Sequence, residues 1–362
     1  MHETLPVPEL PPEELEEVAL EIGPQWEELR EGAVFLTGGT GFIGPWLVES
    51  FLRANSRFHL KASLVVLTRD PERFWRQAPH LSHRPEVRFH RGDIRSFEFP
   101  PGSFSHIIHG AAPAAAPAAG EDPIELVETI VGGTRRVLDF ASCAGVRKVL
   151  LLSSGAVYGT QPPDMAAIPE DYPGAPQPRD RRFAYGEGKR VAESLCCAAA
   201  DRTGWEAKVA RCFTFAGPRL PLDGPFAIGN FVRDALARRP IRVRGDGSAI
   251  RSYLYASDLA AWLWTILFRG CPDRAYNVGS DWAISIADLA RTVAAILPGG
   301  VPVEIVAPGG GQTPLQRYVP DIGRAAAELG LRVRVPLEEA IRRMAAWYER
   351  CPGYCSAIGA VP

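Results

Sequence analysis

A glycine-rich turn at residues 37–44, TGGTGFIG, constrains the fold of this chain more than any other feature. It lies between a short apolar run, Ala33–Thr37, and a stretch at 43–52 whose apolar residues recur at helical spacing. Glycine suits a turn that must bend tightly, let a pyrophosphate approach the main chain and let the helix pack close to the strand. The free amides of the helix then receive the phosphates. The pattern predicts a dinucleotide site with contacts from Gly38, Gly41, Phe42, Ile43 and Gly44.

Further apolar runs alternate with helical patterns along the first two thirds of the chain. This alternation predicts an α/β fold, a Rossmann-like doubly wound parallel sheet, with a smaller α/β C-terminal substrate domain. The expected strands are Ala33–Thr37, Ser63–Leu67, Val87–His90, His106–His109, Lys148–Leu152 and Lys208–Phe213, and the expected helices span 12–22, 26–30, 123–143 and 185–202. The expected divisions are an acidic extension at 1–32, a dinucleotide-binding domain at 33–213 with a substrate loop at 160–182, a mainly substrate-binding part at 214–350 from which 251–270 returns to the first domain, and a tail at 351–362.

Charge and composition exclude several classes of function. With a net charge of −2 the chain has no positive electrostatic field that would attract a polyanion, so we expect no nucleic-acid partner. The longest apolar run, Leu259–Phe268, is far short of the roughly 20 residues that span a bilayer. The acidic N-terminus is unlike a signal peptide, and we therefore expect a cytoplasmic protein without a membrane partner. The seven cysteines have irregular spacing without metal-ligand patterns, which predicts no metal site.

The end of the second expected strand bears on the choice between NAD and NADP. A carboxylate there binds the ribose hydroxyls of NAD, whereas an arginine favours the extra phosphate of NADP. The position expected to be acidic holds Thr68, and Arg69 follows it. NAD and NADP both stay open, with a slight preference for NADP. Asp93, after the third strand, is a candidate contact to adenine.

A Tyr–x–x–x–Lys spacing at 185–189 is the most informative local signal for chemistry. It places the phenol of Tyr185 and the ammonium of Lys189 on one face of a helix. Only four of the 40 basic residues are lysines, which makes a chance match rare. A phenol needs a nearby cation to become a base at neutral pH. Ser154, at the end of the fifth expected strand, can hold a substrate oxygen against Tyr185.

These blocks together resemble the extended short-chain dehydrogenase/reductase family, in its NAD-dependent nucleotide-sugar epimerase/dehydratase branch. The resemblance covers roughly residues 33–349. The blocks are TGGTGFIG at 37–44, GDIR at 92–95, SSGAVYG at 153–159, YGEGK at 185–189, RCFTFAGP at 211–218, GDGSAIRSYLYASDLA at 245–260 and YNVG at 276–279.

The resemblance implies a role for several residues. Tyr185 would be the general base, Lys189 its partner on the nicotinamide ribose, and Ser154 the hydroxyl that orients substrate. Arg251 would clamp the diphosphate of a nucleotide sugar, for which a planar and always-charged guanidinium is suited. Thr214 and Asn230 are further expected substrate contacts. Resembling enzymes commonly dimerise, so we also expect a homodimer, with the helix at 123–143 as the candidate interface.

Two departures from the family pattern bear on the reaction. Sugar 4,6-dehydratases of the branch usually carry an acidic pair after the serine or threonine, and UDP-glucuronate decarboxylases carry a glutamate at the second of these positions. Here the residues are Gly155 and Ala156. Epimerases tolerate small residues there, so an epimerase working through a transient keto-sugar is the favoured prediction. A 4,6-dehydratase or decarboxylase, an NADPH-dependent 4-keto-sugar reductase and a non-catalytic dinucleotide-sensing protein are the alternatives.

Overall fold

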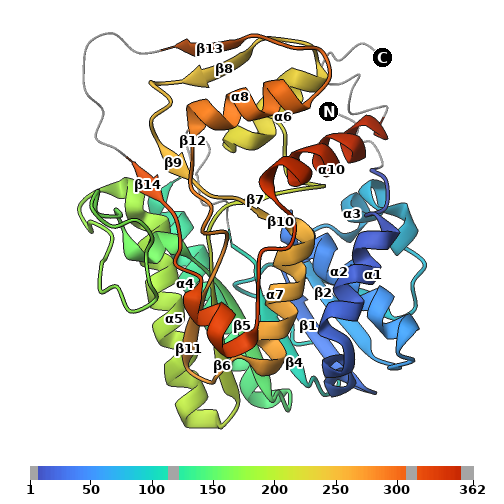
Figure 1. Cartoon of the computed structure of the whole chain (residues 1–362). Coiled ribbons are helices and arrows are strands. Elements are labelled where there is room, and N and C mark those ends of the chain that lie inside the picture. The colour runs from blue at the N-terminus through green and yellow to red at the C-terminus, as the bar shows by residue number, and fades with distance from the viewer. Residues whose placement is uncertain (1–6, 113–121, 307–315, 352–362) are drawn as a thin grey trace.

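A seven-stranded sheet forms the centre of the protein (Figure 1). The computed structural model describes residues 7–112, 122–306 and 316–351. The strands lie in the order β11-β6-β5-β4-β1-β2-β3, and each neighbouring pair is parallel. Their bounds are β1 Ala33–Thr37, β2 Ser63–Thr68, β3 Val87–Arg91, β4 His106–His109, β5 Lys148–Ser154, β6 Glu206–Cys212 and β11 Arg274–Val278. The predicted parallel α/β sheet is confirmed, and its strand order reverses direction between β1 and β4.

The edge strand β11 was not among the predicted strands. Its buried sequence includes Asn277, a polar residue that interrupts the apolar pattern. The Asn277 amide is satisfied within the fold, because its Nδ2 donates to the carbonyl oxygens of Ile168 and Asp321, at 2.8 and 3.0 Å. A buried polar side chain is tolerated when it finds such partners, and these lie far away in the sequence.

Helices cover both faces of the sheet. On one face, α4 packs against α5, and on the other α1 and α2 pack against α7 (Figure 1). Their bounds are α1 Pro12–Ile22, α2 Ile43–Arg57, α4 Pro123–Cys143, α5 Ala184–Thr203 and α7 Ala256–Arg269. Alternation along β1 divides its side chains between the two cores, since Phe35 packs with α4 and α5 while Val34 and Leu36 pack with α1, α2 and α7.

A second group of elements has its own hydrophobic core, which lies above the carboxyl edge of the sheet in Figure 1. It contains α6 Ala227–Leu236, β8 Ile241–Arg244, α8 Ile286–Ile296, β13 Val303–Val306 and α10 Leu337–Glu349. Between the two cores lies a three-stranded sheet in the order β12-β9-β14, made of β9 Ile250–Arg251, β12 Ile284–Ser285 and β14 Arg317–Tyr318. The remaining elements are η1 Gly23–Leu29, α3 Pro71–Gln77, η2 Pro79–Leu81, η3 Gly155–Tyr158, η4 Arg181–Phe183, β7 Phe215–Ala216, β10 Leu254–Tyr255 and α9 Gly323–Leu329.

The predicted domain boundaries stay predictions. Apart from Cys351, the predicted tail at 351–362 lies outside the described residues, as do the first six residues of the acidic extension. Within the described ranges, none of the helices is long and apolar enough to cross a membrane.

The N-terminal helix α1 is part of the core and buries a carboxyl group there. Glu14 is only 4 % exposed, and its Oε1 accepts a hydrogen bond of 3.1 Å from the hydroxyl of Tyr255. Arg343 lies 3.7 Å from the same oxygen. Burial raises the pKa of Glu14 from its ordinary 4.5 to about 7, and the contacts with Tyr255 and Arg343 offset only part of this shift.

The raised pKa of Glu14 predicts that the stability of the fold depends on pH. A carboxyl whose pKa is higher in the folded state stabilises the fold while protonated, and that stabilisation is lost as the pH rises from 4.5 to 7. Wild type should therefore lose about 2 kcal/mol of unfolding free energy relative to Glu14→Gln between pH 5 and pH 8. Urea unfolding at both pH values measures this difference. The exposed Glu13 is the control, since Glu13→Gln should track wild type; equal pH dependence of Glu14→Gln and wild type would contradict the prediction.

Candidate active site

The glycine-rich turn between β1 and α2 has the backbone geometry of a dinucleotide cradle. Gly38 has φ +79°, and a Cβ there would lie 2.6 Å from the carbonyl carbon of Gly110. A Cβ on Gly44 would lie 2.2 Å from the carbonyl carbon of Gly39, so these two glycines allow the backbones to approach. Gly41 differs, because a Cβ there would meet only the Gly38 oxygen, at 3.7 Å. The space beside Gly41 is open to a ligand.

The start of α2 offers amides to that ligand. The helix begins at Ile43, its N-cap residue Phe42 makes no side-chain capping bond, and the first turn holds no acidic residue. The unpaired N–H groups and the positive end of the helix dipole therefore suit an anionic group. These residues fit the pyrophosphate of NAD or NADP.

The residues at the ends of β2 and β3 lie near each other. The side chain of Asp70 caps α3 by accepting from the Arg73 amide at 2.9 Å, so it is committed to the helix. Thr68 is 9 % exposed and Arg69 is exposed, with no ion pair to the described residues. Asp93 accepts bonds from the side chain and amide of Arg95, which with the more distant charge of Arg69 lower its pKa.

The structure brings Tyr185, Lys189 and Ser154 together at the carboxyl edge of the sheet. The Lys189 ammonium lies 5.8 Å from the centroid of the Tyr185 ring and donates to the Leu152 oxygen at 2.8 Å. Ser154, at the end of β5, accepts from the Ala156 amide at 3.1 Å, and its hydroxyl is near enough to the Tyr185 phenol to lower the pKa of that group. The three predicted acid–base residues therefore form one cluster.

Burial affects the two titrating members of this cluster in opposite directions. It raises the pKa of Tyr185 above its ordinary value, while the bond from Ser154 lowers it. It lowers the pKa of the Lys189 ammonium to about 8. In both cases burial makes the neutral form of the side chain more favourable, because a site without water disfavours charge.

His109 lies beside this cluster in a structural role. Its Nδ1 contacts the hydroxyl of Thr37 at 2.8 Å and its Nε2 contacts that of Thr134 at 3.0 Å. Burial and the Lys189 charge lower the pKa of His109 to about 3, so the ring is neutral. These contacts give the ring a structural role rather than that of a base.

The predicted substrate contacts lie on separate elements. Arg251 on β9 is partly buried, and its Nη1 donates to the backbone oxygens of Ile250 and Gln316, at 2.8 and 3.1 Å. No carboxylate acts on it among the described residues, and burial lowers its pKa. Thr214, between β6 and β7, donates to the Ser252 oxygen and so connects this part of the chain to the residue that follows β9. Asn230 is turned to its own loop, donating at 3.0 Å to the backbone oxygens of Gly224 and Phe226.

Sequence reasoning missed Tyr318, which β14 carries to Ser154. A Cβ on Gly155 would lie 2.6 Å from the Tyr318 hydroxyl and 2.7 Å from Cζ of Phe213. The Ser154 hydroxyl lies close enough to lower the pKa of the Tyr318 phenol against the larger effect of burial, which raises it. Residues 154 and 318 are far apart along the chain and no local pattern marks Tyr318, so only the pairing of β14 with β9 reveals it.

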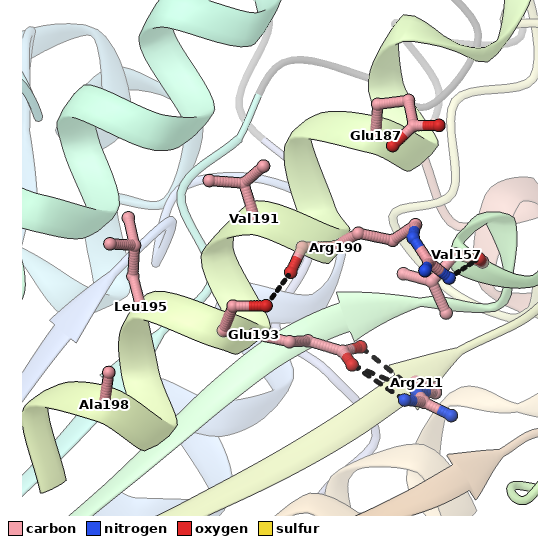
Figure 2. A pocket seen from close by; sticks show the side chains of 9 residues that line it. Val157, Glu187, Arg190, Val191, Glu193, Leu195, Ala198 and Arg211 are labelled. Carbon is pink, nitrogen blue, oxygen red and sulfur yellow. Dashed lines mark hydrogen bonds and ion pairs between the residues drawn. The ribbon is translucent and has the colours of Figure 1, made fainter. Parts of the chain in front are cut away.

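A cavity of about 670 Å³ lies along α5 (Figure 2). Neither Tyr185 nor Lys189 is among the residues that line it. Figure 2 shows Arg211 at one side of it, paired with Glu193 at 2.8 Å. Glu193 also accepts from the hydroxyl of Ser153 at 2.5 Å. This carboxylate is thus held by two partners, and its charge also raises the pKa of the nearby Lys189 ammonium against the effect of burial.

The open space at Gly41 generates a binding prediction. Gly41→Ala leaves the fold intact because its Cβ meets no close neighbour, but the methyl group fills the space that the pyrophosphate needs. The Kd for NAD should rise at least about tenfold, the loss of one good phosphate hydrogen bond, with an unchanged Tm. Calorimetric titration and thermal unfolding measure the two quantities. Gly132→Ala in α4 is the control, since its Cβ would meet only Arg95 at 3.9 Å; unaltered NAD binding by Gly41→Ala would contradict the assignment.

Comparisons with known proteins agree with this geometry. The sequence model of the NAD dependent epimerase/dehydratase family matches residues 34–279. UDP-glucuronic acid decarboxylase 6 of Arabidopsis thaliana is 30 % identical over 312 residues, which cover 86 % of this chain and 87 % of that protein. DesIV from Streptomyces venezuelae, a dTDP-glucose 4,6-dehydratase solved with NAD and TYD bound, has a TM-score of 0.75 and 25 % identity over 90 % of this chain and 99 % of its own. MoeE5 in complex with UDP-glucuronic acid and NAD has a TM-score of 0.72 and 26 % identity over 88 % of this chain and all of its own. With its dinucleotide cradle, its Tyr–Lys–Ser cluster and a family match over most of its length, this chain belongs to the NAD-dependent epimerase/dehydratase family.

Proposed function

We propose that this chain is a nucleotide-sugar epimerase that works through a transient keto-sugar. The observation that carries the proposal is an acid–base cluster of Tyr185, Lys189 and Ser154 without a carboxylate at the two positions that follow the serine. Relatives named for epimerisation, dehydration and decarboxylation of nucleotide sugars support the substrate class. Epimerisation needs only oxidation, rotation of the keto-sugar and reduction, so it needs no further acid.

The residues of the cluster divide the proton transfer between them. Tyr185 Oη takes the proton of a sugar hydroxyl and later returns one to the keto oxygen. Ser154 holds that oxygen against the phenol, which aligns the groups for transfer. Lys189, fixed by the Leu152 carbonyl, supplies the positive charge that stabilises the phenolate. NAD, when bound, supplies the hydride acceptor that later returns the hydride, together with a positive charge beside the phenol.

Arg251 supports a diphosphate in the substrate. No carboxylate acts on this partly buried guanidinium among the described residues, so its charge destabilises the fold until an anion binds beside it. A diphosphate offers paired oxygens that match the planar donor fork of arginine. The nucleotide half of the substrate would then lie along β9, with its sugar directed to Ser154.

A decarboxylase is the second candidate, because the chain is 30 % identical to a UDP-glucuronic acid decarboxylase over most of its length. The glutamate of those enzymes corresponds to Ala156. The neighbouring position cannot supply a carboxylate either, since Tyr318 and Phe213 fill the space beside Gly155. Glu193 is the carboxylate that acts on Lys189, and its bonds to Ser153 and Arg211 keep it occupied.

The exposed apolar residues of α4 and α5 support a homodimer. Ile124 is 67 % exposed and Val191 is 42 % exposed, on two helices that pack against each other. An exposed apolar side chain on each of these helices suits contact with a second copy.

Incubation of the enzyme with a panel of nucleotide sugars in deuterated water, with NAD or NADP supplied, tests the proposed reaction. NMR should show a new epimer without net change of cofactor, and Tyr185→Phe should lower the rate by at least about 100-fold while NAD still binds. Loss of carbon dioxide would move the protein to the decarboxylases, and a 4-keto-6-deoxy product would move it to the dehydratases. Stoichiometric consumption of NADPH would indicate a reductase. Inertness toward every sugar would contradict the substrate class and favour a dinucleotide-sensing protein.

We further propose that the site accepts NADP, with Arg69 as the contact to its additional phosphate. Thr68 takes the usual acidic position and Asp70 caps α3, so no carboxylate of β2 opposes that phosphate. Arg69→Ala should raise the Kd for NADP about tenfold, the loss of one charge-assisted bond, and leave the Kd for NAD unchanged. Titration of both dinucleotides measures this ratio, with Arg242→Ala on β8 as a control of equal charge. Equal effects on NAD and NADP would contradict the assignment.

A further inference from the structure

Lys189 must carry its positive charge in a buried position. Its side chain is 3 % exposed, and its ammonium donates to the Leu152 oxygen at 2.8 Å. Burial lowers the pKa of Lys189 to about 8, and a buried cation without a nearby anion favours its neutral form. The proposed reaction needs the cation, because it stabilises the Tyr185 phenolate. A negative charge close to Lys189 would therefore support the acid–base chemistry.

The titratable groups that face Lys189 come from three elements. They are Tyr185 and Glu193 on α5, Cys212 on β6 and His109 on β4. Burial raises the pKa of Cys212 to about 12 and lowers that of His109 to about 3, so both groups are neutral at neutral pH. The Tyr185 phenol is neutral as well, because burial raises its pKa. Of these four groups, Glu193 is the one that brings a negative charge to Lys189.

The geometry of α5 places Glu193 beside Lys189. The two residues are four positions apart on the helix, so their side chains lie on the same face. They also reach neighbouring residues of β5, because Lys189 donates to the Leu152 oxygen while Glu193 accepts from the Ser153 hydroxyl at 2.5 Å. The carboxylate and the ammonium are therefore held at adjacent points of the same strand, near enough for their charges to interact.

Arg211 on β6 holds this carboxylate in place. Its Nη2 donates to Glu193 Oε2 at 2.8 Å and its Nε donates to Oε1 at 3.1 Å, so both oxygens are engaged (Figure 2). The Nη1 of Arg211 donates to the Tyr158 hydroxyl and to the Glu170 backbone oxygen, at 2.9 and 3.0 Å, which fixes the guanidinium itself. Glu193 thus acts on Lys189 through its charge and leaves the N–H donors of the ammonium to the backbone and to ligands.

We propose that Glu193 is a positioning residue for the reaction, which keeps Lys189 charged so that the lysine can stabilise the Tyr185 phenolate. The proposal rests on the acid–base roles proposed above and deepens them. Glu193 neither touches substrate nor exchanges a proton with it. Arg211 limits the strength of the effect, because it fixes the place of the carboxylate and its own positive charge opposes that of Lys189.

The first test measures the ionisation of Lys189 in the NAD-bound protein. The chain has four lysines, so isotopic labelling of lysine Cε gives four NMR signals, and Lys189→Arg identifies the signal of this residue. Glu193→Gln removes the charge but keeps an oxygen that accepts from Ser153 and Arg211. The titration midpoint of Lys189 should fall by about one pH unit, the effect of losing one nearby charge in a partly screened site. An unmoved midpoint would overturn the proposal.

Two further variants separate the charge of Glu193 from its packing. Arg211→Gln removes a positive charge that opposes Lys189, so the midpoint should rise in this variant. A fall in both Glu193→Gln and Arg211→Gln would mean that the packing of the pair matters rather than its charge, and would contradict the proposal.

Glu187→Gln is the matched control. It removes an equal charge from the same helix, two residues before Lys189, but Glu187 is not among the groups that act on the ammonium. The midpoint of Lys189 should therefore equal that of wild type. A fall as large as that of Glu193→Gln would show that any carboxylate of α5 has this effect, which rejects a specific role for Glu193.

The pH profile of kcat/KM connects this ionisation to turnover, with the sugar nucleotide that wild type converts fastest. A lysine with a lower pKa loses its charge at lower pH, so the descending limb should move about one pH unit lower in Glu193→Gln. An unmoved limb beside a lowered NMR midpoint would reject the role of Glu193 in the reaction. A lowered midpoint in a protein that converts no sugar nucleotide would support the effect of Glu193 on Lys189 and reject only the proposed reaction.

Discussion

The close approach of α5 to the end of β5 is the constraint on which the rest of the site depends. A Cβ on Gly186 would lie 2.5 Å from the Ala156 carbonyl oxygen, so the helix could not reach this position with any larger residue. Two residues further along, a Cβ on Gly188 would lie 3.2 Å from the Ile130 side chain of α4. The two glycines within 185–189 therefore do more than separate Tyr185 from Lys189, because they let the helix bring both side chains to Ser154. Without the close packing of α5 on the segment that follows β5, Tyr185 and Lys189 would not lie near Ser154.

The burial that this packing creates has opposing effects on the chemistry. It excludes water from the phenol and the ammonium, which strengthens every hydrogen bond and charge interaction between them. It also raises the pKa of Tyr185 and lowers that of Lys189 to about 8, so Tyr185 is a neutral phenol at neutral pH while Lys189 keeps its positive charge. The site is thus arranged so that the active protonation state depends on ligands and on the direction of a few hydrogen bonds. Hydroxyl groups such as that of Ser154 can turn without a change of backbone, and this makes their orientation a controlling variable.

Much of the fold could be predicted because its signals are local. The glycine turn, the apolar runs and the helical patterns each lie within one short segment, and the predicted strands from β1 to β6 appear in the structure within two residues of their expected bounds. The Tyr185/Lys189 spacing is local as well. Strand β11 was missed because Asn277 is satisfied by residues far along the chain, and Tyr318 was missed for the same reason. Periodicity reports what faces a core, whereas these residues are defined by contacts between distant segments.

The packing around Gly155 has a consequence for how reactions diverge within such a fold. A newly acquired carboxylate at position 155 would collide with the Tyr318 hydroxyl and with the ring of Phe213. A change in reaction type at this position therefore requires compensating substitutions on β14 and at the end of β6, in segments separated by more than a hundred residues of chain. A carboxylate at position 155 alone would be deleterious, because Tyr318 and Phe213 leave no space for it. An engineering effort aimed at this site should accordingly randomise positions 155, 213 and 318 together, since a library at one position samples none of the viable combinations.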